Sequence, residues 1–570
     1  MDFHIDRSEE GSVMGRPVLT TMQPAAAVLP RLHTAHTLAD ASLHLAASEN
    51  FIKVVDAYWE TARTAQSEWS TWRIQDRLKV LRRLRMAVAE DPRALAKSVH
   101  RQNIAETLAA EVLPLLDACR FLEGEAPRIL RERTIGGRGR PKWLWGNSVV
   151  LRPEPLGVVL VIGPSNYPMM LPGIQGLQAI AAGNSVLIKP AVHGTPSIQH
   201  LLTLAKSAGL PDGVMQVLPE EPEAAALAIR KGVDKVFLTG SANTGRAVSH
   251  ELAESTTPCV MELSGCDAVF VLEDADLNLV SDCLLLGLTF NQSQTCMAPR
   301  RVFVRHKHAD ELVRLLKAKL ENRVRSVLDQ QQAQDGSSAS TQPAGVRFSA
   351  PATRRDRMQE QLIAAAVQQG AELVVGSLAG GSCEDQIGVV VLDRVSSQMS
   401  IAQKDLFAPV LSVIRVESDS QALQENAKCP FALCATVFGS RASCHELARR
   451  IPAGCVVIND MIVPTADPRV PFGGRLMSGH GKTRGQAGLL EMTHLKAIVA
   501  TRRWFKPHLH QPTVADSEVL EHLIRLEHAA SPLQTLKALP KMIRATIQQV
   551  QLRSKSIDFL QERSTQGTRS

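Results

Sequence analysis

One cysteine of this chain lies in the polar stretch Asn291-Gln292-Ser293-Gln294-Thr295-Cys296-Met297-Ala298-Pro299-Arg300, shortly after the apolar run Leu284–Leu288. The amides beside this thiol could donate hydrogen bonds to an oxyanion. A lone cysteine is more often a small buried apolar residue, and a catalytic cysteine needs a partner base elsewhere in the fold. Its role therefore depends on the other motifs of the chain.

Upstream, one glutamate lies between apolar and small residues, in Met261-Glu262-Leu263-Ser264-Gly265. Apolar surroundings raise the pKa of a carboxyl group because burial disfavours its charged form. A carboxylate whose pKa lies nearer neutrality suits a general base. On its own, the segment is equally typical of an ordinary glutamate on a helix surface, so both interpretations stay open at this point.

A third segment, Gly163-Pro164-Ser165-Asn166-Tyr167-Pro168, places an asparagine between prolines, where a turn is the ordinary interpretation. The three segments resemble the oxyanion loop, the general-base motif and the nucleophile motif of the aldehyde dehydrogenase superfamily, in that order. The resemblance implies that Cys296 is the nucleophile, that Glu262 is the base and that Asn166 donates its amide to the oxyanion.

The resemblance covers residues 55–505 and implies a site for a nicotinamide cofactor. Ligands of open α/β sheets bind at the carboxyl ends of strands, where a helix N-terminus favours a phosphate. The implied cofactor contacts are Ser165, Lys189, Gly240, Ser241, Gly245, Leu263, Asp405 and Phe407. The implied walls of the aldehyde pocket are Tyr167, Phe290 and Phe472. Ser165, Ser264 and Asp405 stand where the family usually has tryptophan, glycine and glutamate.

The choice between NAD and NADP depends on the residues that follow Lys189. Family members that prefer NAD often carry a glutamate there, which binds the ribose hydroxyls. Here the stretch is Ala191-Val192-His193-Gly194-Thr195-Pro196, which holds no acid. A 2′-phosphate would then not be repelled, and Lys189 and His193 could attract it. We therefore expect NAD or NADP as the cofactor. NADP should be accepted, and a preference of the protein for NADP over NAD is an open hypothesis.

Strand and helix patterns alternate along residues 154–265, which predicts an α/β protein with a Rossmann-like parallel sheet. The family resemblance adds a second α/β domain, which carries the catalytic cysteine, and a β-arm for oligomerisation. We expect an extension over 1–50, a cofactor domain over 51–140 and 154–265, a catalytic domain over 266–470 and an arm over 141–153 and 496–508. The stretch 330–344, rich in Gln, Ser and Ala, predicts a mobile loop.

Composition limits the partners. The net charge of +7 is modest for 570 residues and no basic stripe is interleaved with aromatics, so nucleic-acid binding is not expected. The ten cysteines show neither a C-x-x-C pair nor zinc-ligand spacing, so no metal site is expected. Free thiols favour a reducing compartment, here the cytoplasm. The first residues lack the pattern of a secretory signal.

Residues 511–570 have no counterpart in the common family core. Segments 518–526 and 542–552 have helical periodicity, and Arg544, Arg553 and Lys555 give the second segment a basic face. The ordinary interpretation is a helical appendage that packs on its own protein or on another subunit. The alternative is a peripheral contact with a membrane surface or a partner. No span of about 20 apolar residues exists there, so a transmembrane anchor is not expected.

The expected activity is oxidation of a small-molecule aldehyde to the carboxylic acid by a homodimer or homotetramer. A thiohemiacetal and then a thioester would form on Cys296, and water activated by Glu262 would hydrolyse the thioester. One alternative is an acylating enzyme that passes the acyl group to coenzyme A, although such members usually lack a glutamate at the position of Glu262. Another alternative is a non-catalytic family member that acts as a binding or scaffold protein.

Overall fold

The computed structural model describes a mixed α/β chain with two parallel-sheet domains, which confirms the predicted fold class. The described residues are 38–101, 103–335, 354–376, 388–502, 507–509, 514–528, 531, 533, 537–548 and 550–551.

Six strands form the sheet of the cofactor domain, in the order β17-β7-β6-β3-β4-β5. Their bounds are β3 (Val158–Ile162), β4 (Ser185–Lys189), β5 (Met215–Val217), β6 (Lys235–Gly240), β7 (Cys259–Leu263) and β17 (Gly479–His480). The first five strands run parallel, and only β17 pairs antiparallel, on the outer side of β7. The strand order reverses beside β3, because β4 follows on one side and β6 on the other. Ligands of such sheets bind at the carboxyl ends near this point.

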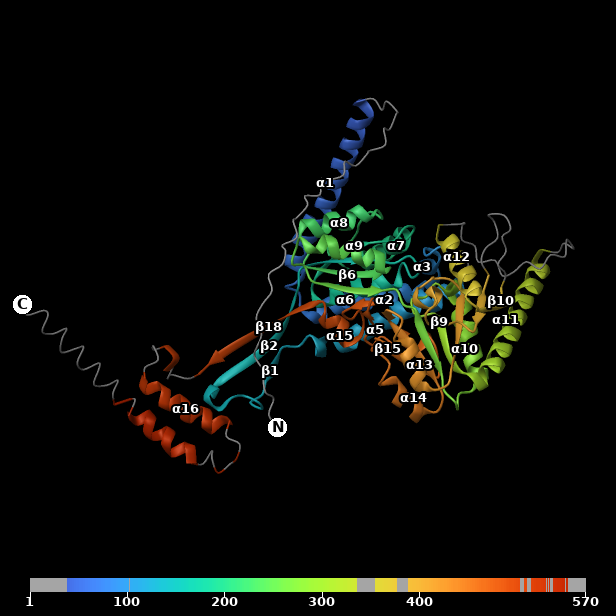
Figure 1. Ribbon diagram of the computed structural model, residues 1–570. Coiled ribbons are helices and arrows are strands. Elements are labelled where there is room, and N and C mark those ends of the chain that lie inside the picture. Colours follow the sequence, from blue (N-terminus) through green and yellow to red (C-terminus); the bar gives the residue numbers. More distant parts are fainter. Residues whose placement is uncertain are drawn as a thin grey trace, which may run out of the picture. The chain divides into compact units, whose positions relative to one another are not determined.

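Helices cover both faces of this sheet, which is why its strands are almost wholly apolar (Figure 1). On one face lie α6 (Met170–Ala182), α7 (Thr195–Ser207), α2 (Ile74–Glu90) and α5 (Leu113–Ile129). On the other lie α8 (Pro222–Lys231) and α9 (Ala242–Ala253). Residues 156–188, which include no charged residue, thus contain β3, α6 and β4.

The leading helices are α1 (Leu38–Trp69), α2, α3 (Pro92–Lys97), α4 (Ile104–Thr107), a π-helical turn η1 (Leu108–Val112) and α5. Helix α1 begins at Leu38, within the extension predicted over 1–50, and the chain divides into two compact units after Phe51. The first residues of α1 are mostly alanine and leucine, which are strong helix formers. Residues 1–37 lie outside the described residues.

Seven strands form the catalytic sheet, in the order β10-β11-β12-β9-β8-β14-β15. Their bounds are β8 (Asp267–Val271), β9 (Pro299–Arg305), β10 (Glu372–Val375), β11 (Val390–Asp393), β12 (Val410–Val416), β14 (Cys434–Phe438) and β15 (Cys455–Ile458). Only β10 is antiparallel to its neighbour. The covering helices are α10 (Leu277–Thr289) and α11 (His306–Asp335) on one face, and α12 (Arg354–Gln368), α13 (Asp419–Asn426) and α14 (Arg441–Ala448) on the other.

The loop predicted over 330–344 also needs correction, because α11 continues through Asp335. Glutamine and alanine are good helix formers, so this Gln- and Ala-rich run extends the helix. Residues 336–344 lie outside the described residues.

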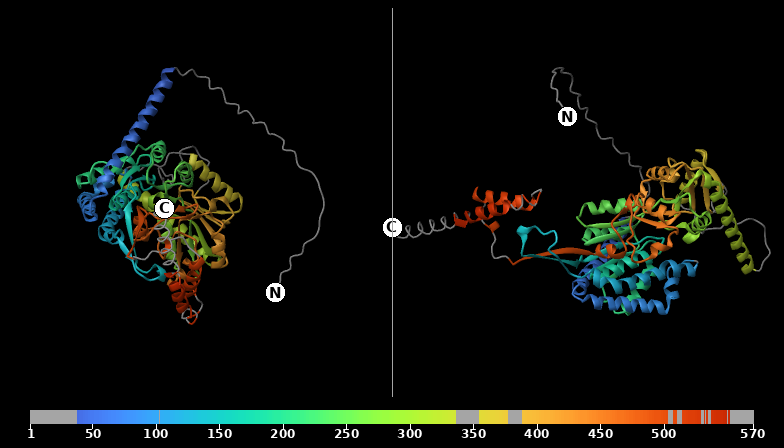
Figure 2. Two further views of the ribbon diagram at one scale, coloured as in Figure 1. Left: turned by 90° about the vertical axis from the view of Figure 1, so that its left-hand side faces the viewer. Right: turned by 90° about the horizontal axis from the view of Figure 1, so that it is seen from below.

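The predicted arm is a three-stranded antiparallel sheet of β1 (Arg133–Ile135), β2 (Asn147–Pro155) and β18 (Thr493–Thr501). Strand β1 lies upstream of the first expected range, 141–153. Strand β18 begins before the second expected range, 496–508, and already ends at Thr501. Strands β2 and β18 project from the two larger sheets as a narrow ribbon (Figure 1 and the right-hand view of Figure 2). One edge of β18 has no partner strand among the described residues, and Leu495, Ile498 and Val499 are exposed on it.

The C-terminal extension contains α16 (Val514–His528) and a second helical stretch at residues 537–548. Helical structure is therefore confirmed for 518–526 and for 542–548, whereas Arg553 and Lys555 lie outside the described residues. Apolar side chains remain exposed on both helices: Leu520, Ile524, Leu539, Ile543 and Ile547. Within the described part of the chain, every helix is too short or too polar to cross a membrane.

Candidate active site

Cys296 lies in the connection between α10 and β9, at the amino end of β9. Just before it, Asn291, Gln292 and Ser293 all have left-handed backbones, with φ of 48°, 54° and 57°. Each such residue costs on the order of 1–3 kcal/mol and persists only where its surroundings hold it. Three in a row therefore indicate that neighbouring side chains fix this loop.

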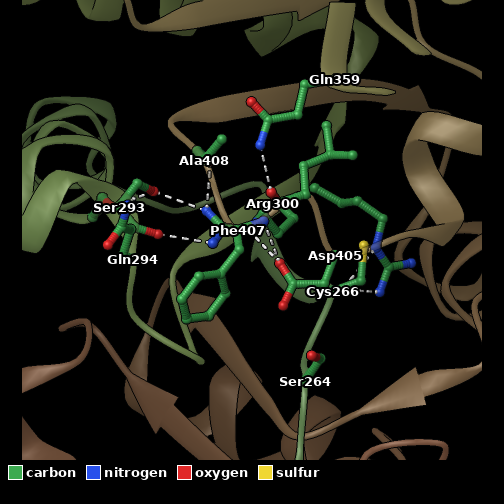
Figure 3. A network of polar contacts seen from close by, with 12 residues as sticks. Ser264, Cys266, Ser293, Gln294, Arg300, Gln359, Asp405, Phe407 and Ala408 are labelled. Carbon is green, nitrogen blue, oxygen red and sulfur yellow. Dashed lines mark hydrogen bonds and ion pairs between the residues drawn. The ribbon is translucent and has the colours of Figure 1, made fainter. Parts of the chain in front are cut away.

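Arg300 holds the loop from inside. Its guanidinium donates from Nη1 to the Ser293 hydroxyl and from Nη2 to the Ser293 carbonyl, each at 2.8 Å. The same side chain donates from Nη1 to the Ala408 carbonyl at 3.0 Å and from Nε to Oδ1 of Asp405 at 3.1 Å (Figure 3). Arg300 ends the quoted cysteine stretch, but no residue pattern in the sequence indicates this role, because Asp405 and Ala408 come from a segment more than 100 residues away.

Asp405, predicted to contact the nicotinamide ribose, is buried as the partner of Arg300. Its Oδ1 also accepts the backbone N–H of Phe407 at 2.9 Å, and Phe407 has a left-handed backbone with φ of 52°. The carboxylate thus joins the Cys296 loop to the segment that carries Phe407. A ribose contact would have to share this carboxylate with Arg300, so that role stays a prediction.

The thiol of Cys296 points at Glu262. Its Sγ lies 3.9 Å from Oε1 of Glu262, and the hydroxyl of Thr483 donates to Oε2 of the same carboxylate at 3.1 Å. Glu262 lies in β7, beside the antiparallel strand β17, and is only 2% exposed. The fold thus brings together the two residues that the sequence assigned as nucleophile and base, from positions 34 residues apart.

Burial raises the pKa of Glu262, with smaller opposing effects from Arg484, Thr483 and Cys296, which confirms the shift expected from its apolar neighbours. Burial also raises the pKa of Cys296 well above its ordinary value, and the charge of Glu262 raises it further. In the free protein the Cys296 thiol therefore keeps its proton near neutral pH.

Arg484 is a buried cation of this site that the sequence did not reveal. Its charge opposes the raised pKa of both Glu262 and Cys296. The guanidinium donates to the Thr465 carbonyl at 2.7 Å and lies 4.7 Å from the ring centroid of Phe472. It lies twelve residues after Phe472 in the sequence, where an arginine would ordinarily be taken for a solvated surface residue.

We expect alkylation of Cys296 by iodoacetamide in the free protein to accelerate about tenfold per pH unit from pH 7 to pH 9. The thiolate is the reactive form, and the pKa of Cys296 is raised, so its thiolate fraction keeps growing over this range. Peptide mass spectrometry would separate this thiol from the half-buried Cys259. A rate that levels off below about pH 8 would show a thiol already activated without cofactor.

The loop after β3 carries Asn166 to the cysteine loop. Its side-chain amide donates to the Gln294 carbonyl at 3.0 Å, which uses one of its two N–H groups. The hydroxyl of Tyr167 lies 2.7 Å from that of Thr295, next to Cys296. Asn166 and Tyr167 are therefore placed beside the nucleophile, whereas their oxyanion and pocket roles remain predictions.

The other two expected pocket residues lie in different surroundings. Phe472 is fully buried under Arg484, and Phe290 is half-buried at the end of α10, where it packs on the cores of both domains. Phe290 stands six residues before Cys296 on the same connection. The pocket roles of Phe290 and Phe472 therefore stay predictions.

Arg101 and Glu111 support the Asn166 loop from behind. Glu111 is fully buried, accepts Nη2 of Arg101 at 2.9 Å and also accepts the backbone N–H of Met170 at 2.7 Å. Arg101 donates to the Asn166 carbonyl and lies 5.0 Å from the ring centroid of Tyr167. The π-helical turn η1 carries Glu111, and periodicity alone does not point to a buried ion pair there.

The glycine turn after β6, whose residues are predicted to contact the cofactor, joins this strand to α9. Ser241 is the N-cap of α9 and accepts the backbone N–H of Thr244 at 3.1 Å, directly after Gly240 ends the strand. A side chain at Gly245 would come within 2.7 Å of Leu263, so the helix packs closely on β7. Ser165 is exposed in the loop after β3, at the same carboxyl edge of the sheet.

Lys189 ends β4 and is 8% exposed. Burial lowers its pKa, while the charges of Glu220, Glu221 and Glu223 oppose that effect. No described residue accepts a hydrogen bond from its ammonium group. An acidic side chain does lie at the turn that follows Lys189, although the turn itself contains none. Glu220 reaches this turn from the loop after β5 and accepts the backbone N–H groups of His193 and Thr195.

Comparisons with known proteins identify a family and similar solved structures. The family model described as "Aldehyde dehydrogenase family" matches residues 41–498. A betaine aldehyde dehydrogenase of Brucella melitensis is 30% identical over 456 residues, 78% of this chain and 89% of that protein.

Two solved structures share the fold. The NADP complex of an NADP-dependent glyceraldehyde-3-phosphate dehydrogenase from Bacillus halodurans has a TM-score of 0.68 and 26% identity, covering 79% of this chain and 92% of that one. The NAD+ complex of an aldehyde dehydrogenase from Bacillus cereus has a TM-score of 0.69 and 25% identity, covering 79% and 89%. The chain described here belongs to the aldehyde dehydrogenase family.

Proposed function

We propose that this protein oxidises an aldehyde to the carboxylic acid with NAD or NADP, through a covalent bond to Cys296. The observation that carries the proposal is the approach of the Cys296 thiol to the buried Glu262 carboxylate, at 3.9 Å, in a fold of the aldehyde dehydrogenase family. Hydrolytic release, rather than transfer of the acyl group to coenzyme A, is supported by the presence of that carboxylate.

The residues of the site divide the reaction between them. The Cys296 thiol loses its proton to solvent, and its thiolate attacks the aldehyde carbon to form a thiohemiacetal oxyanion. The free amide N–H of Asn166 is the side-chain donor for that oxyanion, and Arg101 keeps the loop in place. A nicotinamide held by this chain would supply the hydride acceptor, and loss of hydride from the thiohemiacetal carbon would leave a thioester on Cys296. Glu262 then takes a proton from a water that attacks the thioester and returns it to the departing Cys296 sulfur, which releases the acid and restores the thiol.

The residues at the carboxyl edge of the first sheet fit a dinucleotide. The α9 N-terminus offers backbone N–H groups to a pyrophosphate, and the tight contact of Gly245 with Leu263 brings that helix close to the sheet. Lys189 supplies a buried cation whose ammonium has no acceptor in the described chain. These residues would hold the phosphates and the adenosine ribose, and relatives of this chain are known in complexes with either cofactor.

The activity is tested by the rate of nicotinamide reduction with purified protein, NAD or NADP, and a series of aliphatic and aromatic aldehydes. Turnover to a free carboxylic acid is the expected result. Turnover only with added coenzyme A, and a thioester product, would replace the hydrolytic proposal with the acylating one. Folded protein that binds the cofactor but turns over no aldehyde would favour the non-catalytic alternative.

Two surfaces belong to proposed contacts with other molecules. We propose that the exposed edge of β18 binds a second copy in a homodimer or homotetramer, and that the exposed apolar residues of 511–570 lie on a membrane surface or a partner. Light scattering of the full chain is expected to give a multiple of 62.0 kDa.

Sedimentation with anionic vesicles is expected for the full chain but not for a chain that ends at residue 510. Equal sedimentation of both chains would rule out the proposed membrane contact of residues 511–570.

The nine described cysteines are all unpaired, including Cys434 and Cys455, which face each other on neighbouring strands. This supports the proposal of a reducing, cytoplasmic environment.

A further inference from the structure

Glu220 extends from the loop after β5 to the turn that follows Lys189. We propose that its carboxylate selects against the 2′-phosphate of NADP, so that this protein binds NAD more tightly. The inference rests on the proposed function, because it takes the carboxyl edge of β4 as the adenosine end of the cofactor site.

The Glu220 side chain is held in one position. Its Oε2 accepts the backbone N–H of His193 at 2.8 Å, and its Oε1 accepts the backbone N–H of Thr195 at 3.0 Å. Strands β4 and β5 are paired in register, Ile188 with Val217, so the segments that follow them emerge side by side. His193 itself has a left-handed backbone with φ of 65°, and the two hydrogen bonds stabilise this turn.

The carboxylate is charged in this position. Burial alone would raise the pKa of Glu220, but the hydrogen bonds from Thr195 and His193 outweigh burial and leave its pKa lowered. A carboxylate has about four acceptor sites on its two oxygens. With one accepted N–H on each oxygen, Glu220 can still accept a ribose hydroxyl, whereas it would repel a phosphate.

The balance of charge around Lys189 points the same way. The charges that act on this ammonium come from Glu220 first, then Glu221 and Glu223. Three carboxylates against one ammonium make this end of the site negative. A phosphate monoester adds about two negative charges at neutral pH, whereas the free 2′-hydroxyl of NAD adds none and can donate a hydrogen bond. Glu220 thus takes the place of the acid that is missing from residues 191–196.

The test is equilibrium binding to the full-length protein, measured by titration calorimetry without aldehyde. The ligands are NAD+, NADP+, adenosine 5′-monophosphate and adenosine 2′,5′-bisphosphate. The wild-type protein is expected to bind NAD+ and adenosine 5′-monophosphate at least about tenfold more tightly than their counterparts that carry a 2′-phosphate. Glu220→Gln is expected to reduce this ratio of affinities by about tenfold. Asp212→Asn is the matched control, because Asp212 precedes β5, lies at the opposite edge of the sheet and is exposed.

The outcomes separate the two proposals. Wild-type protein that binds both classes of ligand equally, or a Glu220→Gln protein with an unchanged ratio, would overturn the inference and leave the proposed function standing. Failure of the wild-type protein to bind any of the four ligands would overturn both. If Glu220→Gln lowers the melting temperature, the exposed Glu223→Gln tests the same charge argument. For Glu223→Gln, a smaller but measurable fall in the ratio of affinities would support the inference, whereas an unchanged ratio would contradict it.

Discussion

Replacement of Cys296 by alanine is expected to lower kcat for aldehyde oxidation by roughly 10⁴-fold or more. The protein should keep its fold and its affinity for the cofactor. The thiol is the atom that would form the covalent bond, and no other described cysteine approaches Glu262 in the same way. The loss of one small side chain leaves the clamp from Arg300 to Ser293 intact.

The measurement is the rate of nicotinamide reduction, with melting temperature and cofactor affinity as controls for folding. Cys444→Ala is the matched variant, because Cys444 is buried in α14 on the far side of the catalytic sheet from α10 and should leave turnover unchanged. Residual turnover above a few per cent in Cys296→Ala would show that another group carries the chemistry.

Replacement of Glu262 by glutamine has the second-largest expected effect. Steady-state turnover should fall by about 10²–10⁴-fold, because an amide cannot accept the proton of the attacking water. Glutamine has nearly the same shape, so the hydrogen bond from Thr483 and the packing of β7 should survive. A single burst of reduced cofactor, about one per site, should remain, since hydride leaves before water attacks.

Rapid-mixing absorbance would measure the burst and the steady state in one experiment. Glu417→Gln, an exposed glutamate after β12, is the charge-matched control. A variant without a burst would place the action of Glu262 earlier, at removal of the proton from Cys296, whose Sγ lies 3.9 Å away. Unchanged steady-state turnover would remove Glu262 from the role of base altogether.

Much of the site was predictable because its chemistry lies in short, contiguous segments. Cys296 and Glu262 each follow or precede apolar runs that had to be buried, and burial is what raises the pKa of both. The glycine turn at Gly240–Gly245 was predictable for the same local reason, since a strand, a tight turn and a helix start are all written in consecutive residues.

The boundaries were less predictable. The sequence predicted a loop over 330–344, whereas α11 runs to Asp335. This stretch is rich in good helix formers but has weak apolar periodicity, so its composition suggested a loop where the helix continues as far as Asp335.

By itself, the sequence determined the fold class and the order of the motifs, which depend on local residue order and on which runs are apolar. Its resemblance to the aldehyde dehydrogenase family supplied the nucleophile and base proposed here. Only the tertiary structure revealed that Arg300 clamps the cysteine loop to Asp405, that Arg484 is a buried cation beside Glu262, and that Glu220 supplies a carboxylate to the turn after Lys189. Each of these joins side chains from segments far apart in the chain. Their effect arises because burial strengthens charge interactions between groups that only folding brings within a few ångströms.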